Sequence, residues 1–392
     1  MSSLAIDNIG LLVTNDPALG EGPLGKRRDC SLVFEDGVVV AVGAAGALAD
    51  EALDAGGRCV IPGFVDSHTH LVFAGDRAAE FAARMAGAEY EAGGIRVTAE
   101  ATRGAGAETL RELARQRREE GLRAGITHVE IKSGYGLETE AERRCCEVAA
   151  ELTDDVTFLG AHVLPAEFRA DPDAYVELVR GPMLDACAPF CRWIDAFCEV
   201  GAFDADQCRA VLEAGRSAGL GLRLHGNQLG QGPGVGLAVE LGAASVDHCT
   251  YLGPADVEAL GGGETVATFL PATDFSTRQP YPPAREVLAA GATVALATNT
   301  NPGSSNTTSM GFCIALAVRE MEMTVDEALW AATAGGAAAL RRADLGRISP
   351  GARADAVVLD ALSPVDFVYR PGVPIVAQTF VGGELRWSAA PI

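Results

Sequence analysis

Six histidines occur in the 392 residues, and five of them stand at or just beyond the end of an apolar, strand-like run. These five are His68 and His70 after residues 60–65, His162 in 156–162, His225 in 221–225 and His248 in 244–248. A lone histidine at a strand end is usually an ordinary core or surface residue. Five of them predict that imidazoles gather on one rim of the fold.

The sharpest local pattern is VDSHTH at residues 65–70. Residues i and i+2 of an extended segment point the same way, so His68 and His70 can present both rings to one cation. His225 adds a third imidazole from another strand end. Imidazole ligands with an open coordination position favour zinc or ferrous iron. Such an ion lowers the pKa of a bound water to about 7 and makes hydroxide available at neutral pH.

The elements that must position these histidines alternate along the chain as strand and helix. Candidate strands are residues 60–65, 126–131, 156–162, 193–199, 221–225, 244–248, 266–270 and 293–298, with helices expected at 107–123 and 326–341 among others. Eight strands separated by helices predict a (β/α)₈ barrel over residues 60–346, with its active site at the C-terminal ends of the strands. Residues 1–59 and 347–392 show short apolar runs and turn signals, which predict one small β-sandwich domain made from both chain ends.

Charge and hydropathy exclude several classes of partner. The formal net charge of −22 argues against nucleic acid and against an anionic membrane surface, since both require a basic face. No apolar run reaches the roughly 18 to 20 residues of a membrane span. The N-terminal residues lack the basic and apolar regions of a signal peptide, so we expect a cytoplasmic protein. The sequence leaves a homodimer open.

Four longer segments are similar, in order, to the imidazolonepropionase family of the metal-dependent amidohydrolase superfamily. They are PGFVDSHTHLVFAGDR, EIKSGYGLETE, TFLGAHVLPAEF and VALATNTNPGSS. The resemblance covers essentially the whole chain. It implies a barrel with a terminal β-sandwich, and hydrolysis of the cyclic amide of 4-imidazolone-5-propionate to N-formimidoyl-L-glutamate. It also implies a single metal ion, zinc or iron, on His68, His70, His225 and the residue at position 299.

The resemblance further implies roles for residues around the metal. The matching positions would bind the substrate at Arg77, Tyr135, His162, Gln228, Asn301, Gly303 and Ser304, and would act on the reacting water or ring at His248, Gln228 and Asn299. A guanidinium such as that of Arg77 suits the propionate carboxylate. Lys132 has the alternative of being a carbamylated metal bridge, but a single-metal site has no such bridge, so we expect a structural role for it.

Two positions depart from the family pattern. Asn227 replaces an acidic residue, and Asn299 stands where the family places an aspartate that ligates the metal and accepts a proton from water. An amide oxygen can ligate a metal but is uncharged and cannot act as a base, and general-base assistance is worth about 10²–10⁴ in rate. Three interpretations stay open: a weakened imidazolonepropionase, an offshoot that opens, closes or rearranges another small anionic heterocycle, and a catalytically silent binding protein.

Overall fold

The computed structural model describes residues 3–43, 49–87 and 94–389. It divides into two compact units. The first unit comprises residues 1–66, 119–128 and 309–392, and the second comprises residues 67–118 and 129–308. The predicted domain boundaries at residues 59 and 347 stay a prediction, and residues 1–2, 44–48 and 390–392 of the predicted terminal domain lie outside the described chain.

The second unit is built on a seven-stranded sheet in the order β14-β13-β12-β11-β10-β9-β8. Its strands are β8 (Ile131–Lys132), β9 (Val156–Ala161), β10 (Trp193–Cys198), β11 (Gly221–Gly226), β12 (Ser245–His248), β13 (Val266–Phe269) and β14 (Val294–Leu296). Each neighbouring pair is parallel. The strands are buried along almost their whole length, as expected for a parallel sheet with helices on its outer face. The predicted β/α arrangement is confirmed.

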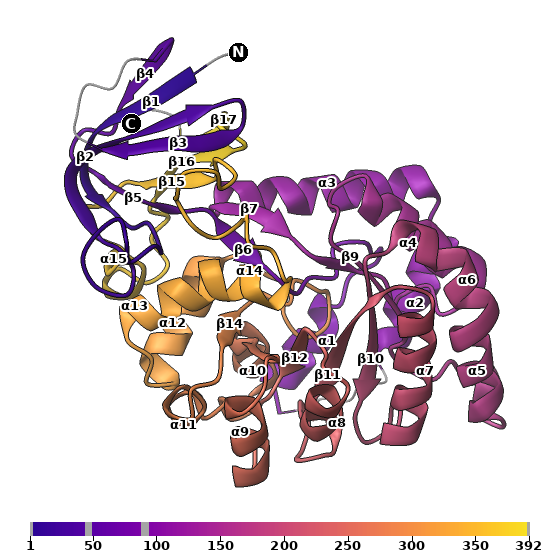
Figure 1. The fold of residues 1–392 in the computed structure, drawn as a ribbon. Coiled ribbons are helices and arrows are strands. Elements are labelled where there is room, and N and C mark those ends of the chain that lie inside the picture. Colours follow the sequence, from indigo (N-terminus) through magenta and orange to yellow (C-terminus); the bar gives the residue numbers. More distant parts are fainter. Residues whose placement is uncertain (1–2, 44–48, 88–93, 390–392) are drawn as a thin grey trace. The chain divides into compact units, whose positions relative to one another are not determined.

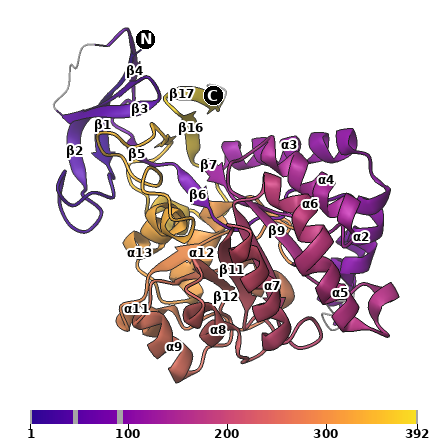
Figure 2. The same cartoon turned by 45° about the vertical axis from the view of Figure 1, so that its right-hand side comes forward.

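Helices connect these strands, and α4, α6 and α7 lie along the outer side of β9 and β10 (Figures 1 and 2). The helices are α1 (Ala78–Met85), α2 (Ile95–Gly104), α3 (Ala107–Arg123, which continues into the first unit), α4 (Thr139–Ala150), α5 (Pro172–Leu178), α6 (Leu184–Cys187), α7 (Ala205–Ser217), α8 (Gly234–Glu240), α9 (Pro254–Gly261), α10 (Pro271–Thr277) and α11 (Ala284–Ala289). The start of α7 is fixed by a capping box between Asp204 and Gln207. The predicted helix at 107–123 is confirmed as α3.

The segment that carries the first two histidines lies between the two edges of this sheet. The backbone N–H of Lys132, in β8, donates to Thr69 O at 2.8 Å. On the other side, the N–H of His70 donates to Thr300 O at 2.9 Å, beyond β14, and Thr69 and Thr300 form a parallel bridge. Residues 68–70 therefore join the edges, and the strand ends form a ring around the site.

The first unit is built on one mixed eight-stranded sheet to which both chain ends contribute, in the order β17-β16-β15-β5-β1-β2-β3 with β4 also paired to β1. Its strands are β1 (Ser3–Leu12), β2 (Arg27–Glu35), β3 (Val38–Gly43), β4 (Glu51–Asp54), β5 (Cys59–Pro62), β15 (Ala356–Leu359), β16 (Val376–Val381) and β17 (Glu384–Ser388). The core contains Ile6, Leu32, Phe34, Val358 and Phe380, drawn from both termini. The prediction that the two chain ends meet in one β structure is confirmed.

A two-stranded sheet of β6 (Phe64–Asp66) and β7 (Ile126–Val129) accompanies it. The predicted strand 60–65 is thus interrupted at Gly63, where a Cβ would lie 2.2 Å from the Thr127 side chain. Helices α12 (Met310–Glu320), α13 (Val325–Trp330), α14 (Gly336–Ala339) and α15 (Asp366–Tyr369) complete this unit. The single helix expected at 326–341 is divided by a π-helical turn at Ala331–Gly335. In the described part of the chain, no helix is long and apolar enough to cross a membrane.

Candidate active site

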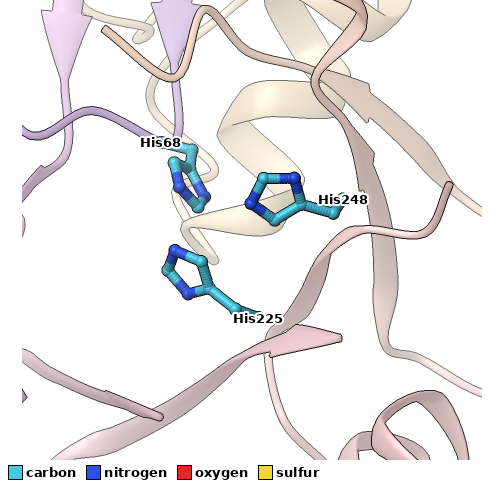
Figure 3. A group of neighbouring side chains, drawn as sticks. All are labelled: His68, His225 and His248. Atoms are coloured by element: carbon cyan, nitrogen blue, oxygen red, sulfur yellow. The ribbon is translucent and has the colours of Figure 1, made fainter. Parts of the chain in front are cut away.

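Three histidines from three strand ends form the centre of the site. Ligand atoms of His68, His225 and His248 all lie within 4.8 Å of one another, and the three rings face a common point (Figure 3). The ring centroids of His68 and His225 are 4.6 Å apart, and those of His225 and His248 are 5.4 Å apart. His70 lies in the same pocket with its ring 5.3 Å from that of His68, but it is outside this group of three. The predicted gathering of imidazoles is therefore present.

These imidazoles are suited to a metal ion. Burial holds the pKa of His68, His70 and His248 well below the usual value, so their rings are neutral and offer lone pairs. Three of their nitrogens are buried and have no hydrogen-bond partner among the described residues: Nε2 of His68, Nδ1 of His70 and Nδ1 of His248. Buried polar atoms in proteins are nearly always paired, and a cation at the common point would be the partner of Nε2 of His68, whose Nδ1 contacts Asp247.

Two carboxylates hold the far sides of two of the rings. Asp247 Oδ2 lies 2.7 Å from Nδ1 of His68, and Asp195 Oδ2 lies 3.0 Å from Nδ1 of His225. Asp195 also accepts the backbone N–H of His225 at 3.1 Å. A carboxylate behind a histidine fixes the ring and its tautomer and makes the opposite nitrogen a better ligand. The Nε2 atoms of His68 and His225 are thereby directed towards the centre of the group.

The carboxylates belong to a fully buried charged network. Lys132 Nζ lies 2.8 Å from Glu130, 2.9 Å from Asp195 and 3.4 Å from Asp247. Arg223 donates to Asp247 at 3.2 Å and to Ser67 O at 2.8 Å. Burial opposes the charge of Lys132, but its carboxylate neighbours outweigh burial and raise its pKa above the usual value. An ammonium held in this way cannot be a carbamate, so the structure supports the structural role expected for Lys132.

Asn299 lies at the end of β14 with its side chain in the site. Its Nδ2 donates to Thr273 Oγ1 at 2.8 Å, and its Oδ1 is buried with no hydrogen-bond partner in the described chain. The backbone adopts a φ of 52°, a left-handed conformation that Asn and Asp tolerate better than other side chains. His248 has a φ of 82°, which is rare for a non-glycine residue and is typical of functional sites. Thr273 thus turns the amide so that an oxygen, the better metal ligand, is directed inward.

A pocket opens above the histidines. It is lined by His70, Arg77, Ile95, Tyr135, His162, Val163, Phe197, His225, Gln228, Leu229, His248, Asn299, Asn301 and Ser304. All predicted site residues therefore lie in or beside one pocket, with His68 among the metal-binding group and Gly303 against Arg77. A pocket with a few convergent polar groups suits a small molecule.

The predicted carboxylate-binding residue is buried. Arg77 donates from Nε and Nη2 to the two oxygens of Glu80, at 2.7 and 2.6 Å, which fixes the plane of its guanidinium. Two glycines lie directly against it: a Cβ on Gly303 would come within 2.1 Å of Nη1, and one on Gly94 within 2.4 Å of Nη2. The local backbone is shaped around this cation, which also lines the pocket.

Other residues around the opening of the pocket, its rim, are fixed by hydrogen bonds from their backbone amides to acceptor side chains. Glu199 Oε2 accepts the N–H groups of Gln228 and Leu229, each at 2.9 Å. Asn301 Oδ1 accepts those of Gly303 and Ser304 at 2.8 and 2.9 Å, so this asparagine shapes the loop after β14 as well as lining the pocket. These loops present their side chains from a fixed backbone.

Asn227 points away from the pocket. Its Nδ2 donates to Tyr251 O at 2.9 Å and contacts Asp256 Oδ2 at 3.4 Å. An acidic side chain in this orientation would bring a carboxylate against a carbonyl and a second carboxylate. The structure therefore explains the amide at position 227 by its neighbours rather than by the chemistry of the site.

Several residues of the site were missed by sequence reasoning, namely Glu130, Glu142, Asp195, Glu199, Arg223, Asp247 and Thr273. For some of these residues, the sequence contained a pattern that could have identified them. Asp195 lies inside the apolar run WIDAF and Asp247 inside SVDH, and a charge within a buried strand needs a partner. Glu130 and Lys132 are two residues apart at the end of the strand-like run 126–131, and alternate residues of an extended segment share a face. Glu142, Glu199 and Thr273 carry no such signal.

The fold and the metal-binding group define an amidohydrolase. The amidohydrolase family model matches residues 195–386. Among solved structures, a triazine hydrolase variant superimposes with a TM-score of 0.77 at 19% identity, covering 98% of this chain and 94% of the other. An adenosine deaminase from Xanthomonas campestris with bound zinc gives 0.74 at 19% identity, covering 98% and 93%. At these identities the likeness shows the fold alone.

Curated relatives narrow the class. An imidazolonepropionase of Salinispora arenicola is 63% identical over 98% of both chains, and one of Mycolicibacterium smegmatis is 59% identical over the full length of both. This chain belongs to the imidazolonepropionase family.

Proposed function

We propose that this chain hydrolyses the cyclic amide of 4-imidazolone-5-propionate and gives N-formimidoyl-L-glutamate. The observation that carries the proposal is the arrangement of one pocket, with neutral, unpartnered imidazole nitrogens at its base and the buried guanidinium of Arg77 in its wall. The full-length likeness to imidazolonepropionases supports it. The partner of the protein is then a small anionic heterocycle.

The donor set fits one divalent transition-metal ion, zinc or iron. His68, His70, His225 and the amide oxygen of Asn299 would hold it, and each of His68, His70 and Asn299 has a buried, unpartnered donor atom. When bound, the ion supplies a Lewis acid for the ring carbonyl and lowers the pKa of a water molecule to about 7. None of the four donors is a carboxylate, and the negative charge near them comes from Asp195 and Asp247 behind His225 and His68.

The other pocket residues would bind and orient the substrate. Arg77 would hold the propionate, because a guanidinium fork matches a carboxylate and Glu80 already fixes its plane. Tyr135, His162 and Gln228 would hydrogen-bond the ring, and Ser304 with the Asn301–Gly303 backbone would close the same side. His248 belongs to the group of three imidazoles without being one of the proposed ligands, so it would orient the attacking water and stabilise the developing oxyanion.

Asn299 makes this proposal specific. Its oxygen can ligate, but it cannot take up a proton, so proton acceptance would fall to His248. Since general-base assistance contributes about 10²–10⁴ in rate, we propose that hydrolysis is slower than an aspartate at this position would allow. An offshoot reaction on another small anionic heterocycle is the alternative that this residue favours.

The test combines metal analysis with turnover. Protein purified without chelators should contain close to one zinc or iron per chain and should convert imidazolonepropionate to formimidoylglutamate. If the protein stays free of metal after incubation with either ion, the hydrolase proposal is refuted and a ligand-binding protein is favoured. Full metal occupancy with no turnover of this substrate would favour the offshoot reaction.

A further inference from the structure

The loop that carries Tyr135 has its backbone amides satisfied by one carboxylate. Glu142, fully buried in α4, accepts the N–H of Gly134 at 2.8 Å through Oε2, and the N–H groups of Gly136 and Leu137 at 2.7 Å each through Oε1. Tyr135 lies between these three donors. Burial raises the pKa of Glu142 to about 7, and the hydrogen bonds from Leu137 and Gly134 act in the opposite direction. The Ser133 hydroxyl and the loop amides therefore favour the ionised carboxylate against burial.

A cation holds the carbonyls of the same loop. Arg103, at the end of α2, donates from Nε to Gly136 O at 2.6 Å and from Nη2 to Leu137 O at 3.0 Å. The loop fits tightly against α4, since a Cβ on Gly136 would lie 2.4 Å from the backbone nitrogen of Glu142. Leu137 adopts a φ of 54°, which local hydrogen bonds must stabilise. Anion and cation together fix a backbone that would not adopt this form alone.

This loop positions two side chains of the pocket, those of Tyr135 and His162. The carbonyl of Gly134 accepts the N–H of His162 Nδ1 at 2.9 Å, which leaves Nε2 of His162 as a lone-pair acceptor. The ring of Tyr135 lies 5.5 Å from that of His162 and 5.7 Å from that of His70. The same loop therefore fixes the position of the tyrosine and the tautomer of His162.

We propose that Glu142, supported by Arg103, is a positioning residue for substrate recognition, acting through Tyr135 and His162 and not through the metal centre. This inference rests on the proposed function, which makes Tyr135 and His162 substrate-binding groups. Glutamine at position 142 keeps the shape but offers one oxygen to three N–H donors and places an NH₂ group against the loop. At least one amide is then left unpaired, and the loop must shift.

The experiment compares Glu142→Gln with Glu147→Gln on the same helix, where the glutamate is half exposed and pairs only with Arg143 in the described contacts. We expect Glu142→Gln to raise KM for imidazolonepropionate at least fivefold, to change kcat less than threefold and to leave the metal content unchanged. Glu147→Gln should alter none of these. An unchanged KM, or loss of metal in parallel with activity, would overturn the proposal.

Two further measurements separate positioning from a general loss of structure. In a double-mutant cycle with Tyr135→Phe, the combined KM increase should be smaller than the product of the single increases, because both changes act on the same contact. If the combined KM increase equals the product of the single increases, Glu142 does not act through Tyr135. If Glu142→Gln does not fold, Arg103→Gln takes its place in the same cycle.

Hydrogen exchange gives a readout that needs no substrate. The amides of Gly134, Gly136 and Leu137 should be protected in the parent and exchange at least tenfold faster in Glu142→Gln, with the rest of α4 unchanged. Equal protection in both proteins would refute the role of Glu142 even if the parent is an active imidazolonepropionase. If exchange is faster in Glu142→Gln but the parent does not turn over imidazolonepropionate, the loop mechanism is retained and the proposed function is refuted.

Discussion

At the floor of the pocket, the rings of His68 and His225 are oriented by carboxylate side chains. At its rim, Tyr135 and Gln228 are carried on backbone segments whose amides are held by glutamate side chains. On the floor, Asp247 and Asp195 lie directly behind two of the rings. On the rim, Glu142 accepts the backbone amides that flank Tyr135, and Glu199 accepts the backbone amide of Gln228. The difference fits the work of each region. Metal ligands need a fixed ring angle, and substrate contacts need a loop whose backbone is held in one conformation.

The largest expected effects lie on the floor. His70→Gln should lose the metal and reduce hydrolysis on the order of 10³-fold or more, because the ion generates the nucleophile. His248→Gln should retain the metal while hydrolysis falls by about 10²–10⁴. Metal content after dialysis, measured beside kcat, separates the two. If His70→Gln retains the metal and His248→Gln loses it, the two roles are reversed and His248 is the metal ligand. That result would agree with the close group of His68, His225 and His248.

Asn299→Asp tests the same metal site with a substitution that should strengthen metal binding and activity. The added carboxylate should tighten metal binding at least tenfold, since an anionic oxygen replaces a neutral one beside a cation. It should also raise kcat/KM for imidazolonepropionate by roughly 10²-fold, following the general-base magnitude. Thr273 can donate its hydroxyl to an aspartate, so the site need not rearrange. Equal kcat/KM at matched metal occupancy would show that the amide is no handicap and that His248 accepts the proton.

A substitution of Arg77 at the rim of the pocket should weaken substrate binding without changing the metal site. Arg77→Ala should weaken binding of the substrate or of formimidoylglutamate at least tenfold, as removal of a desolvated charge partner costs about 2–5 kcal/mol. Arg77→Lys should recover only part of this, because an ammonium lacks the fork. Metal content should not change in either variant, and Arg96→Ala, on the exposed side of α2, serves as the control. Unchanged affinity in Arg77→Ala would place the carboxylate site elsewhere.

The smallest expected effect concerns the pH dependence of stability, through Asp274 in α10. Asp274 is buried, its Oδ1 accepts from Thr250 at 2.8 Å, and burial raises its pKa from 3.8 to about 7. A raised pKa stabilises the fold at low pH, and this contribution is lost as pH rises from about 4 to about 7. Asp274→Asn removes the dependence. Relative to the parent, the metal-free variant should therefore gain roughly 2 kcal/mol in unfolding free energy between pH 5 and pH 8.

Urea unfolding at the two pH values measures this difference. A constant difference between the two proteins would contradict the raised pKa of Asp274.

Sequence analysis located residues of the pocket where a strand end and a reactive side chain coincide, and their roles stay predictions. The histidines and Arg77 could be found because strand periodicity places residues such as His68 and His70 on one face, and because the family motifs surround them. It failed for Glu142 and Glu199, which bind backbone of loops whose course no periodicity reveals. The break of strand 60–65 at Gly63 was also hidden, because it depends on the approach of Thr127 from another strand.

The most direct test of the metal-dependent hydrolase is turnover of imidazolonepropionate by the parent protein with its metal, after chelation, and after zinc or iron is restored. Formation of formimidoylglutamate should be present at about one ion per chain, disappear on chelation and return with the ion. Hydrolysis that persists after complete removal of metal, or no hydrolysis at full occupancy, would contradict the assignment of the histidine floor as the catalytic metal site.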